Sequence, residues 1–342
     1  MKAVVIRAHG GVETLLYEEI ETPEPGPGEV LVRIRASGIN HLDHDVREGV
    51  SGIPVSLPHV PGCEGVGEVA ALGPGVEGPA PGTRVAIDFA QGDPLSEPWL
   101  SGLDGVDFTH GRIGAGQWGT HAEYCVSHAL SVIPLPDALP FETAAAGMIG
   151  LGTAWHMTVA LGRVQAGQTV LVNAAGSVVG SSAIQVALLH GARVIASAGS
   201  AAKLEKAREL GAAETIDYTH QSIRDEALRL TQGRGVDLVI ESVGGDVLRQ
   251  SIDAVCFNGR LVTCGAHAGE EVPLNVIELF RKHMTIHGSH FAGRRELAHV
   301  FALMAEGRLA PVIDTVYPLA EIQTAARRTA DREVFGKMVL VP

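Results

Sequence analysis

Residues 169–180 read TVLVNAAGSVVG, and this stretch decides the fold of the second half of the chain. The apolar, β-branched-rich run Thr169–Asn173 is typical of a buried strand, and a helix is predicted from about Val179 to His190. A short turn of small residues joins the two. A strand, a tight turn and a helix in this order predict the start of a βαβ unit, and therefore a parallel, doubly wound sheet.

The turn itself is suited to a phosphate ligand. Backbone N–H groups at the start of a helix bind a pyrophosphate, and small residues let the two backbones approach each other. The candidate residues are Ala175, Gly176, Ser177, Val178, Val179 and Gly180. The GxGxxG pattern would place glycines at 175, 177 and 180, but alanine and serine occupy the first two positions. On this motif alone, a tight turn without a ligand remains the alternative.

The next strand indicates which dinucleotide would bind. A site for NAD usually has an acidic residue near the end of the second strand, where it meets the ribose 2′-hydroxyl. Here the predicted strand Arg193–Ala198 is followed by GSAAK, which has no acid. Ser200 and Lys203 would suit a 2′-phosphate, which needs hydrogen-bond donors and positive charge. The sequence therefore favours NADPH, with a solvated helical Lys203 as the alternative.

Further elements are predicted on both sides of this unit. The first third reads as short strands separated by turns rich in glycine and proline, and the chain changes near Phe141 to alternating strands and helices. The predicted strands are Val4–Ile6, Val30–Ile34, Arg84–Ile87, His121–Val126, Val236–Glu241, Arg260–Cys264, Met284–His287 and Met338–Val341. The further predicted helices are 202–210, 246–255 and 294–307. We expect the last strand to return to the first domain.

Composition limits the class of protein. The 342 residues are 46% hydrophobic and 19% charged, with a net charge of −13, which favours two packed domains and disfavours nucleic acid or anionic membranes as partners. The four cysteines lack CxxC spacing, so a reducing compartment is expected. The N-terminus has no apolar signal region, and no uninterrupted apolar run reaches 18 residues. We expect a cytoplasmic protein without a membrane span.

At this point the chain resembles the medium-chain dehydrogenase/reductase superfamily over nearly its whole length. The motifs that carry the resemblance are MKAVV from Met1, PGPGEV from Pro25, GINHLD from Gly38, PGCEGVGEV from Pro61, PGTRV from Pro81, GTHAEY from Gly119 and VFGKMVL from Val334. The resemblance implies a GroES-like β-rich catalytic domain, residues 1–149 and 292–342, and a Rossmann domain, residues 150–291. It also implies an active site in the cleft between these domains.

The chain departs from the zinc-containing members of this superfamily. By resemblance, Asn40 stands where they have a cysteine, and Cys63 stands where they have the histidine of a Gly-His-Glu motif. The lobe that binds structural zinc has Asp93, Ser96, Trp99 and Asp107 in place of four cysteines. We therefore predict no zinc at either site. An improvised zinc site built from Cys63, Glu64 and His41 or His44 remains the alternative.

The resemblance also implies roles for individual residues. Asn40 matches the zinc-free quinone and enone reductase branch, in which it contacts the nicotinamide ribose or carboxamide. Further expected cofactor contacts are Thr153, Tyr218, Cys264, Gly265, Gly288, Ser289, His290 and Lys337. For Tyr218, ordinary packing is the alternative. The expected partner of the chain is a second copy of itself, through the sheet edge near Met284–His287; a tetramer remains open.

The leading functional hypothesis is hydride transfer from NADPH to a quinone or to the C=C bond of an α,β-unsaturated carbonyl. Asn40 or a backbone N–H would stabilise the developing enolate oxygen. Asp43, His44, Asp45 and Cys63 are the candidate proton donors by sequence, with water as the alternative. Two other functions remain open: an alcohol dehydrogenase with an unusual zinc site, and an NADPH-binding protein without turnover. The substrate itself is not readable from the sequence.

Overall fold

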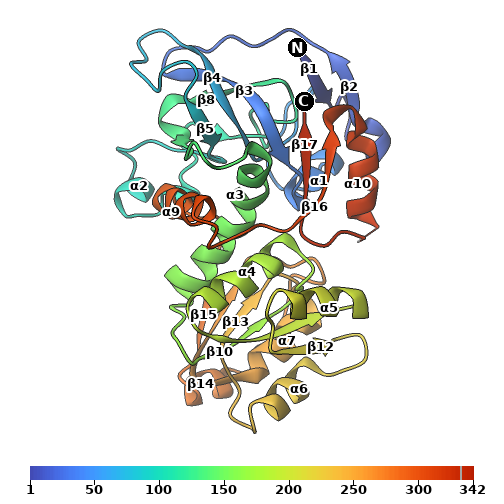
Figure 1. Ribbon diagram of the computed structural model, residues 1–342. Helices are drawn as coiled ribbons and strands as arrows, with labels where there is room; N and C mark the ends of the chain where they lie inside the picture. The colour runs from blue at the N-terminus through green and yellow to red at the C-terminus, as the bar shows by residue number, and fades with distance from the viewer. Residues whose placement is uncertain (332) are drawn as a thin grey trace. The chain divides into compact units, whose positions relative to one another are not determined.

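The computed structural model describes residues 1–331 and 333–342 (Figure 1). The chain forms two compact units, one of residues Met1–Ile149 and Gly293–Pro342 and the other of residues Gly150–Ala292. Each has its own sheet and its own hydrophobic core.

The unit of residues 150–292 is built on a six-stranded sheet. Its strands in chain order are β10 (Thr169–Val172), β11 (Arg193–Ala198), β12 (Glu214–Asp217), β13 (Val236–Glu241), β14 (Val255–Thr263) and β15 (Thr285–Gly288). The spatial order is β12-β11-β10-β13-β14-β15, and all five pairings are parallel. Strands β10, β11 and β13 are buried or nearly so along their length, as expected for a parallel sheet covered on both faces.

Helices cover both faces of this sheet (Figure 1). They are α4 (Val178–Leu189), α5 (Ala201–Glu209), α6 (Ile223–Leu230), α7 (Gly245–Ala254) and α8 (Val276–Arg281). Helices α6, α7 and α8 pack with Leu171 and Val239 in one apolar cluster. The alternate residues Val170 and Val172 are fully buried too. Because side chains alternate along a strand, these two face the opposite side of the sheet, where α4 contacts β10 and β11.

The strand order locates the place where a ligand can bind in this unit. The chain runs outward from β10 through β11 to β12, then returns to β13 on the other side of β10. In open parallel sheets, ligands bind at such a switch point, outside the carboxyl ends of the strands. The turn 174–177 follows β10, and Ser242 follows β13, so both lie at this point.

The unit made from both ends of the chain is rich in short strands. They are β1 (Lys2–Val5), β2 (Leu16–Glu19), β3 (Glu29–Gly38), β4 (Gly65–Leu72), β5 (Arg84–Ile87), β6 (Ala90–Gln91), β7 (Gly111–Arg112), β8 (Tyr124–His128), β9 (Val132–Pro134), β16 (Ile313–Pro318) and β17 (Lys337–Val341). Its helices are α1 (His41–Glu48), α2 (Glu97–Leu100), the first part of α3 (Phe141–Trp155), α9 (Arg294–Ala305) and α10 (Ile322–Ala330).

Strand β3 is the centre of this unit. It pairs antiparallel with β4, β8 and β17. Val30, Val32 and Ile34 alternate along β3 into an apolar core with residues of β4, β5 and β8. The closing strand β17 pairs with the end of β3, Val339 opposite Gly38 and Leu340 opposite Ser37. This pairing brings the C-terminal segment beside residues near position 40.

The sequence predicted several elements to the residue and missed others. The predicted fold class is confirmed, and β5, β11 and β13 have the predicted bounds. Strand β14 begins five residues earlier than predicted, at Val255, because an irregular pairing with β13 carries it past Asn258. The sheet-edge strand β12 was not predicted. It is short and only one of its residues is buried, so its apolar pattern is weak.

One helical segment, Phe141–Leu161, is long and apolar enough to span a membrane by length and composition, a feature that we did not expect from the sequence. It combines α3 with a π-helical end, His156–Leu161. About 67% of its apolar window is buried inside the protein, as in a core helix.

Candidate functional site

The turn after β10 has the geometry of a phosphate-binding loop. Ala174 adopts a left-handed φ of 50°, and Ser177 caps α4 by accepting a 2.9 Å hydrogen bond from the Gly180 N–H. A Cβ atom on Gly180 would overlap the carbonyl oxygen of Ala174, so only glycine allows the helix to approach the turn this closely. The first-turn residues Val178 and Val179 begin a 12-residue helix whose positive end favours an anion.

The predicted determinants of cofactor choice gather at the ends of β11 and β12. Ser200 caps α5 through a 3.4 Å hydrogen bond from the Lys203 N–H. The Lys203 side chain lies over Gly176, where a Cβ would come within 2.7 Å of its Cδ. The Tyr218 ring lies against Gly199, with a Cβ there 3.0 Å from Cε2. A lysine, a serine and a tyrosine thus surround the end of β11 beside the phosphate turn.

One carboxylate is close to this group. Asp217 pairs with Ala198 in the sheet register. Its Oδ1 accepts hydrogen bonds from the N–H and hydroxyl of Thr219, at 3.0 and 2.6 Å. These hydrogen bonds lower the pKa of Asp217, so it is ionised at neutral pH. The carboxylate is directed toward Thr219 in the loop after β12.

The remaining predicted cofactor residues of this unit lie mostly at the same edge of the sheet. Cys264 and Gly265 follow β14, Gly288 ends β15, and Ser289 and His290 follow it. The Ser289 hydroxyl is a buried polar atom with no hydrogen-bond partner among the described residues. Thr153 is buried within α3. The close approach of helix and turn at Gly180 fits a bound dinucleotide. The Ser289 hydroxyl, which has no partner among the described residues, fits one too.

In the other unit, a buried ionic cluster forms around Asn40. Lys337 and Glu64 are both fully buried and form an ion pair. The Lys337 ammonium also donates to Asn40 Oδ1 at 2.6 Å, and Asn40 Nδ2 donates to Glu64 Oε1 at 2.8 Å and to Cys63 Sγ at 3.3 Å. The second Glu64 oxygen accepts from the Ile149 N–H in α3 at 2.9 Å. Lys337, expected to contact the cofactor, is directed into this cluster.

Asp43 has a structural position at the start of α1. Its Oδ2 accepts from the Asn40 N–H at 2.8 Å, and its Oδ1 accepts from the N–H groups of Gly62 and Cys63 at 3.2 and 3.0 Å. Three backbone donors converge on this nearly buried side chain, which suits an acceptor-only carboxylate. Asp43 therefore joins the beginning of α1 to the turn that carries Cys63, and it is poorly placed to donate a proton.

Two more of the predicted proton donors are poorly suited to that role. Burial lowers the pKa of His44 to about 4, so its ring is neutral at pH 7. Burial, reinforced by the nearby carboxylates of Asp43 and Glu64, raises the pKa of the Cys63 thiol well above its ordinary value. A neutral imidazole and a buried thiol are weak acids, so of the predicted donors only the partly exposed Asp45 and water remain.

The atoms that an improvised zinc site would need are already engaged. Both Glu64 oxygens have partners, one of them the Lys337 ammonium, and Cys63 accepts from Asn40. A zinc ion there would have to displace an internal cation and ionise a thiol with a raised pKa. Across residues 1–331 and 333–342, no group of three or more His, Cys, Asp and Glu residues is placed to hold a metal ion. The arrangement does not fit zinc.

The lobe with four substituted cysteine positions is organised by a carboxylate. Asp107 Oδ2 accepts from the Asp93 N–H at 2.8 Å and the Ser96 hydroxyl at 2.5 Å. Its Oδ1 accepts from the Thr109 N–H at 3.1 Å and hydroxyl at 2.6 Å. Desolvation alone would raise the pKa of Asp107, but these hydrogen bonds outweigh it and lower the pKa. Hydrogen bonds to one anion connect the segments that four thiolates and a metal would otherwise join.

Replacing Asp107 by Asn should therefore loosen this lobe by about 1–3 kcal/mol, because an amide cannot accept all four hydrogen bonds. Since the folded pKa is lowered, the carboxylate's contribution is complete above about pH 4 and is lost as the pH falls through the folded value. Hydrogen exchange of residues 93–109 measures the effect, with a chelator-treated wild-type sample as control. Equal exchange in wild type and variant at pH 7, or faster exchange after chelation, would contradict this account.

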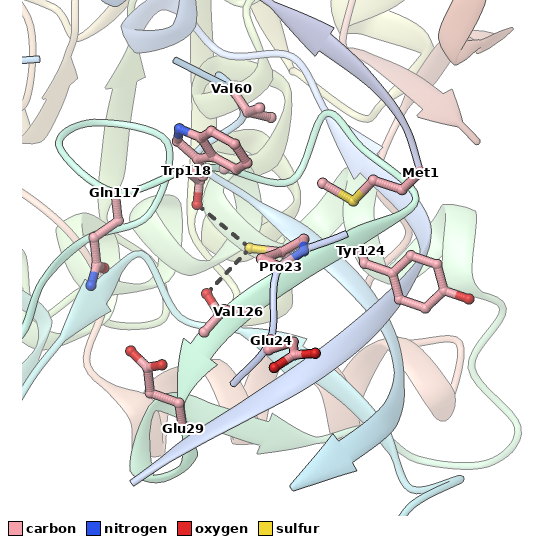
Figure 2. A pocket seen from close by; sticks show the side chains of 11 residues that line it. Met1, Pro23, Glu24, Glu29, Val60, Gln117, Trp118, Tyr124 and Val126 are labelled. Atoms are coloured by element: carbon pink, nitrogen blue, oxygen red, sulfur yellow. Dashed lines mark hydrogen bonds between the residues drawn. The ribbon is translucent and has the colours of Figure 1, made fainter. Parts of the chain in front are cut away.

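A separate pocket of about 300 Å³ lies near the N-terminus (Figure 2). Trp118, Tyr124 and Val60 line it together with the carboxylates of Glu24 and Glu29. The Cys125 thiol is within hydrogen-bond distance of the backbone oxygens of Trp118 and Val126, at 3.6 and 3.5 Å. Two carboxylates without a lysine or arginine do not suit a phosphate-bearing cofactor, and none of the predicted site residues lines this pocket.

Two family models match the chain, an alcohol dehydrogenase GroES-like domain over residues 26–137 and a zinc-binding dehydrogenase over residues 178–306. A quinone oxidoreductase from Pseudomonas aeruginosa is 32% identical over 355 residues, covering 100% of this chain and 99% of the relative. The chain belongs to the medium-chain dehydrogenase/reductase superfamily. As an oxidoreductase of this superfamily, it acts with a nicotinamide cofactor.

Two further relatives differ in what their names describe. A 2-haloacrylate reductase from a Burkholderia species is 29% identical, covering 99% of this chain and 98% of the relative. The solved structure of a protein named NAD-dependent alcohol dehydrogenase is 43% identical, with a TM-score of 0.93 and full coverage of both chains. Relatives whose names describe different reactions are thus similar to this chain over nearly its full length.

Sequence reasoning treated Glu64 only as a possible metal ligand and missed its role as the centre of the ionic cluster. It also missed Glu241, a fully buried acid at the end of β13 that accepts from the N–H groups of Val243 and Gly244. Burial raises the pKa of Glu241 despite these bonds. A charged residue ending an apolar strand was the available signal for it.

Proposed function

We propose that this chain is an NADPH-dependent, zinc-independent reductase that transfers hydride to a quinone or to the C=C bond of an α,β-unsaturated carbonyl. The observation that carries the coenzyme choice is the group of Ser200, Lys203 and Tyr218 around the end of β11. Lys203 already lies over the phosphate turn, and a positive charge there would bind a 2′-phosphate. The relatives named quinone oxidoreductase and 2-haloacrylate reductase support the acceptor class.

The nicotinamide supplies the hydride when the cofactor is bound. The chain's own contribution starts with the turn 174–180, which would hold the pyrophosphate on the N-terminus of α4. Ser289, whose hydroxyl has no hydrogen-bond partner in residues 1–331 and 333–342, would hydrogen-bond the ligand at the end of β15. Protonation of the product carbon would come from water or from Asp45, since burial keeps the His44 ring neutral and raises the pKa of the Cys63 thiol.

The function is tested by metal analysis, cofactor titration and an acceptor screen on one purified sample. We expect less than about 0.1 zinc per chain, tighter binding of NADPH than NADH, and NADPH oxidation by quinones or enones. Near-stoichiometric zinc with alcohol oxidation would overturn the proposal. Cofactor binding without turnover over a broad panel would support a non-catalytic protein.

A second candidate is an NAD-dependent alcohol dehydrogenase, favoured by the similarity to the protein of that name, which is 43% identical to this chain. An NAD site would not need Lys203, because NAD carries no 2′-phosphate. Replacing Lys203 by Ala separates the two. Under the NADPH proposal, the ratio of kcat/KM for NADPH over NADH should fall by about tenfold or more, because one charged hydrogen bond is lost. An unchanged ratio, with Lys2→Ala as a surface control, would favour NAD.

We further propose a homodimer through the β15 edge. This strand ends the sheet, and its exposed Ile286 lies in the same unit as Val276 and Phe280, which are 61% exposed. An open sheet edge with exposed apolar side chains is a typical association surface. Replacing Ile286 by Lys should shift the sedimentation coefficient toward the monomer, with Leu274→Lys as a matched substitution. A monomeric wild-type protein would contradict the proposal.

A further inference from the structure

The Asn40 side chain has nearly used up its hydrogen-bonding capacity inside the protein. A primary amide has two N–H donors and an oxygen with two lone pairs. Both donors are engaged, one with Glu64 Oε1 at 2.8 Å and the other with Cys63 Sγ at 3.3 Å. One lone pair accepts from the Lys337 ammonium at 2.6 Å. A single acceptor position on Oδ1 remains.

The orientation of this amide is determined by Lys337. An ammonium group only donates, so the Asn40 atom that it meets must be the oxygen, and the nitrogen must face Glu64. Glu64 is in turn held on its other oxygen by the Ile149 N–H at 2.9 Å. Gly38 leaves the space for the pair, because a Cβ there would overlap both Glu64 and Lys337. Lys337 in β17, Glu64 just before β4 and Ile149 in α3 therefore hold the Asn40 amide in one orientation.

The side chains of Lys337, Glu64 and Asn40 differ in how far they are buried. Lys337 and Glu64 are fully buried, whereas Asn40 keeps part of its surface exposed. A ligand can therefore reach Asn40 but cannot reach the ion pair behind it. An enolate or carbonyl oxygen that approached Asn40 would need an N–H donor, and both are committed to buried acceptors.

We propose that Lys337 and Glu64 are positioning residues that present Asn40 as a hydrogen-bond acceptor. The group that meets Asn40 in the functional complex is then a donor, such as a hydroxyl or an amide N–H, and stabilisation of a developing oxyanion comes from elsewhere. This inference rests on the proposed function for its kinetic consequences. Its structural part, that the Lys337 ammonium holds the Asn40 amide in one orientation, does not depend on turnover.

The structural content can be measured without activity. The chain has four asparagines, Asn40, Asn173, Asn258 and Asn275, so selective ¹⁵N-asparagine labelling resolves each side-chain amide by NMR. Asn258 and Asn275 are exposed and serve as internal references. We expect the Asn40 side-chain protons to exchange with water at least about tenfold more slowly than those references, because both N–H groups are bonded inside the protein. Equal exchange rates would overturn the inference.

Variants test whether Lys337 provides the lock. Lys337→Met should accelerate exchange at Asn40 and shift its side-chain resonances, while Lys337→Arg, which keeps a donor cation, should retain most of the protection. Glu64→Gln is assayed alongside Lys337→Met, because it keeps an acceptor for Asn40 or Ile149 and gives a second measurement if the first variant folds poorly. Unchanged Asn40 signals in Lys337→Met, or in Glu64→Gln if Lys337→Met does not fold, would overturn the role of the pair.

Kinetics distinguish positioning from a purely structural role. The double variant Lys337→Met with Glu64→Gln removes both charges and should recover stability, yet it lacks the ammonium on Asn40 Oδ1. We expect its kcat to remain about 10- to 100-fold below wild type, the size of effect that misplacement of a contact residue produces. Wild-type kcat and KM in the double variant would overturn the inference. If the wild-type protein shows no turnover, the proposed function is wrong. The NMR measurement would still test the positioning role of Lys337 and Glu64.

Discussion

Replacing Lys337 by Met should lower the free energy of unfolding by about 3–5 kcal/mol, the usual cost of breaking a buried ion pair by removing one partner. Methionine fills similar space, so the loss comes from the Glu64 carboxylate, which stays fully buried without its cation. Urea unfolding followed by tryptophan fluorescence and circular dichroism measures the change. The double variant with Glu64→Gln should regain most of it, because no buried charge remains.

Lys2→Met is the matched control. Lys2 also pairs with a glutamate, Glu19, at 3.3 Å, but both side chains are largely exposed. Solvent screening makes such surface pairs weak, and we expect a change below about 1 kcal/mol. A similarly small loss for Lys337→Met would mean that the buried ion pair contributes little, and the description of the cluster would then be wrong.

The fold was largely predictable because its signals are local. The run 169–180 joins a buried strand to a helix within a dozen residues, and its period and turn chemistry need no distant partner. The same holds for β11 and β13, which have the predicted bounds. Strands β4 and β16 and the edge strand β12 were not predicted, since their stability comes from pairing in the sheet rather than from a strong apolar pattern.

The site was predictable only in part, for the same reason. The residues at the strand ends share one edge because parallel strands point the same way, so their grouping follows from the fold class. Asn40 and Lys337 are 297 positions apart and meet only because β17 pairs with β3. No local pattern reports that Lys337 is buried, and a lysine is rarely buried without a partner. The inward direction of Lys337 follows only from the pairing of β17 with β3.

The phosphate turn leads to the second large effect, because Gly180 has no room for a side chain. We expect Gly180→Val to weaken NADPH binding by about 100-fold or more, since the turn must open and the N–H groups at the start of α4 move away from the pyrophosphate. The added Cβ would overlap the Ala174 carbonyl oxygen and lie 3.0 Å from Ala175 Cα. Backbone atoms cannot move aside cheaply, so relaxation must shift the helix itself.

Loss of stability alone must be separated from loss of the site. Ile184→Ala, in the same helix, removes a fully buried side chain and should cost about 2–5 kcal/mol without touching the turn. Titration calorimetry with NADPH, well below both melting temperatures, should then show near wild-type affinity for Ile184→Ala and a large loss for Gly180→Val. If both variants bind equally well, the turn after β10 does not hold the cofactor. If both lose affinity together, binding depends on the rigidity of α4 as a whole, and the close approach at Gly180 has no separate role.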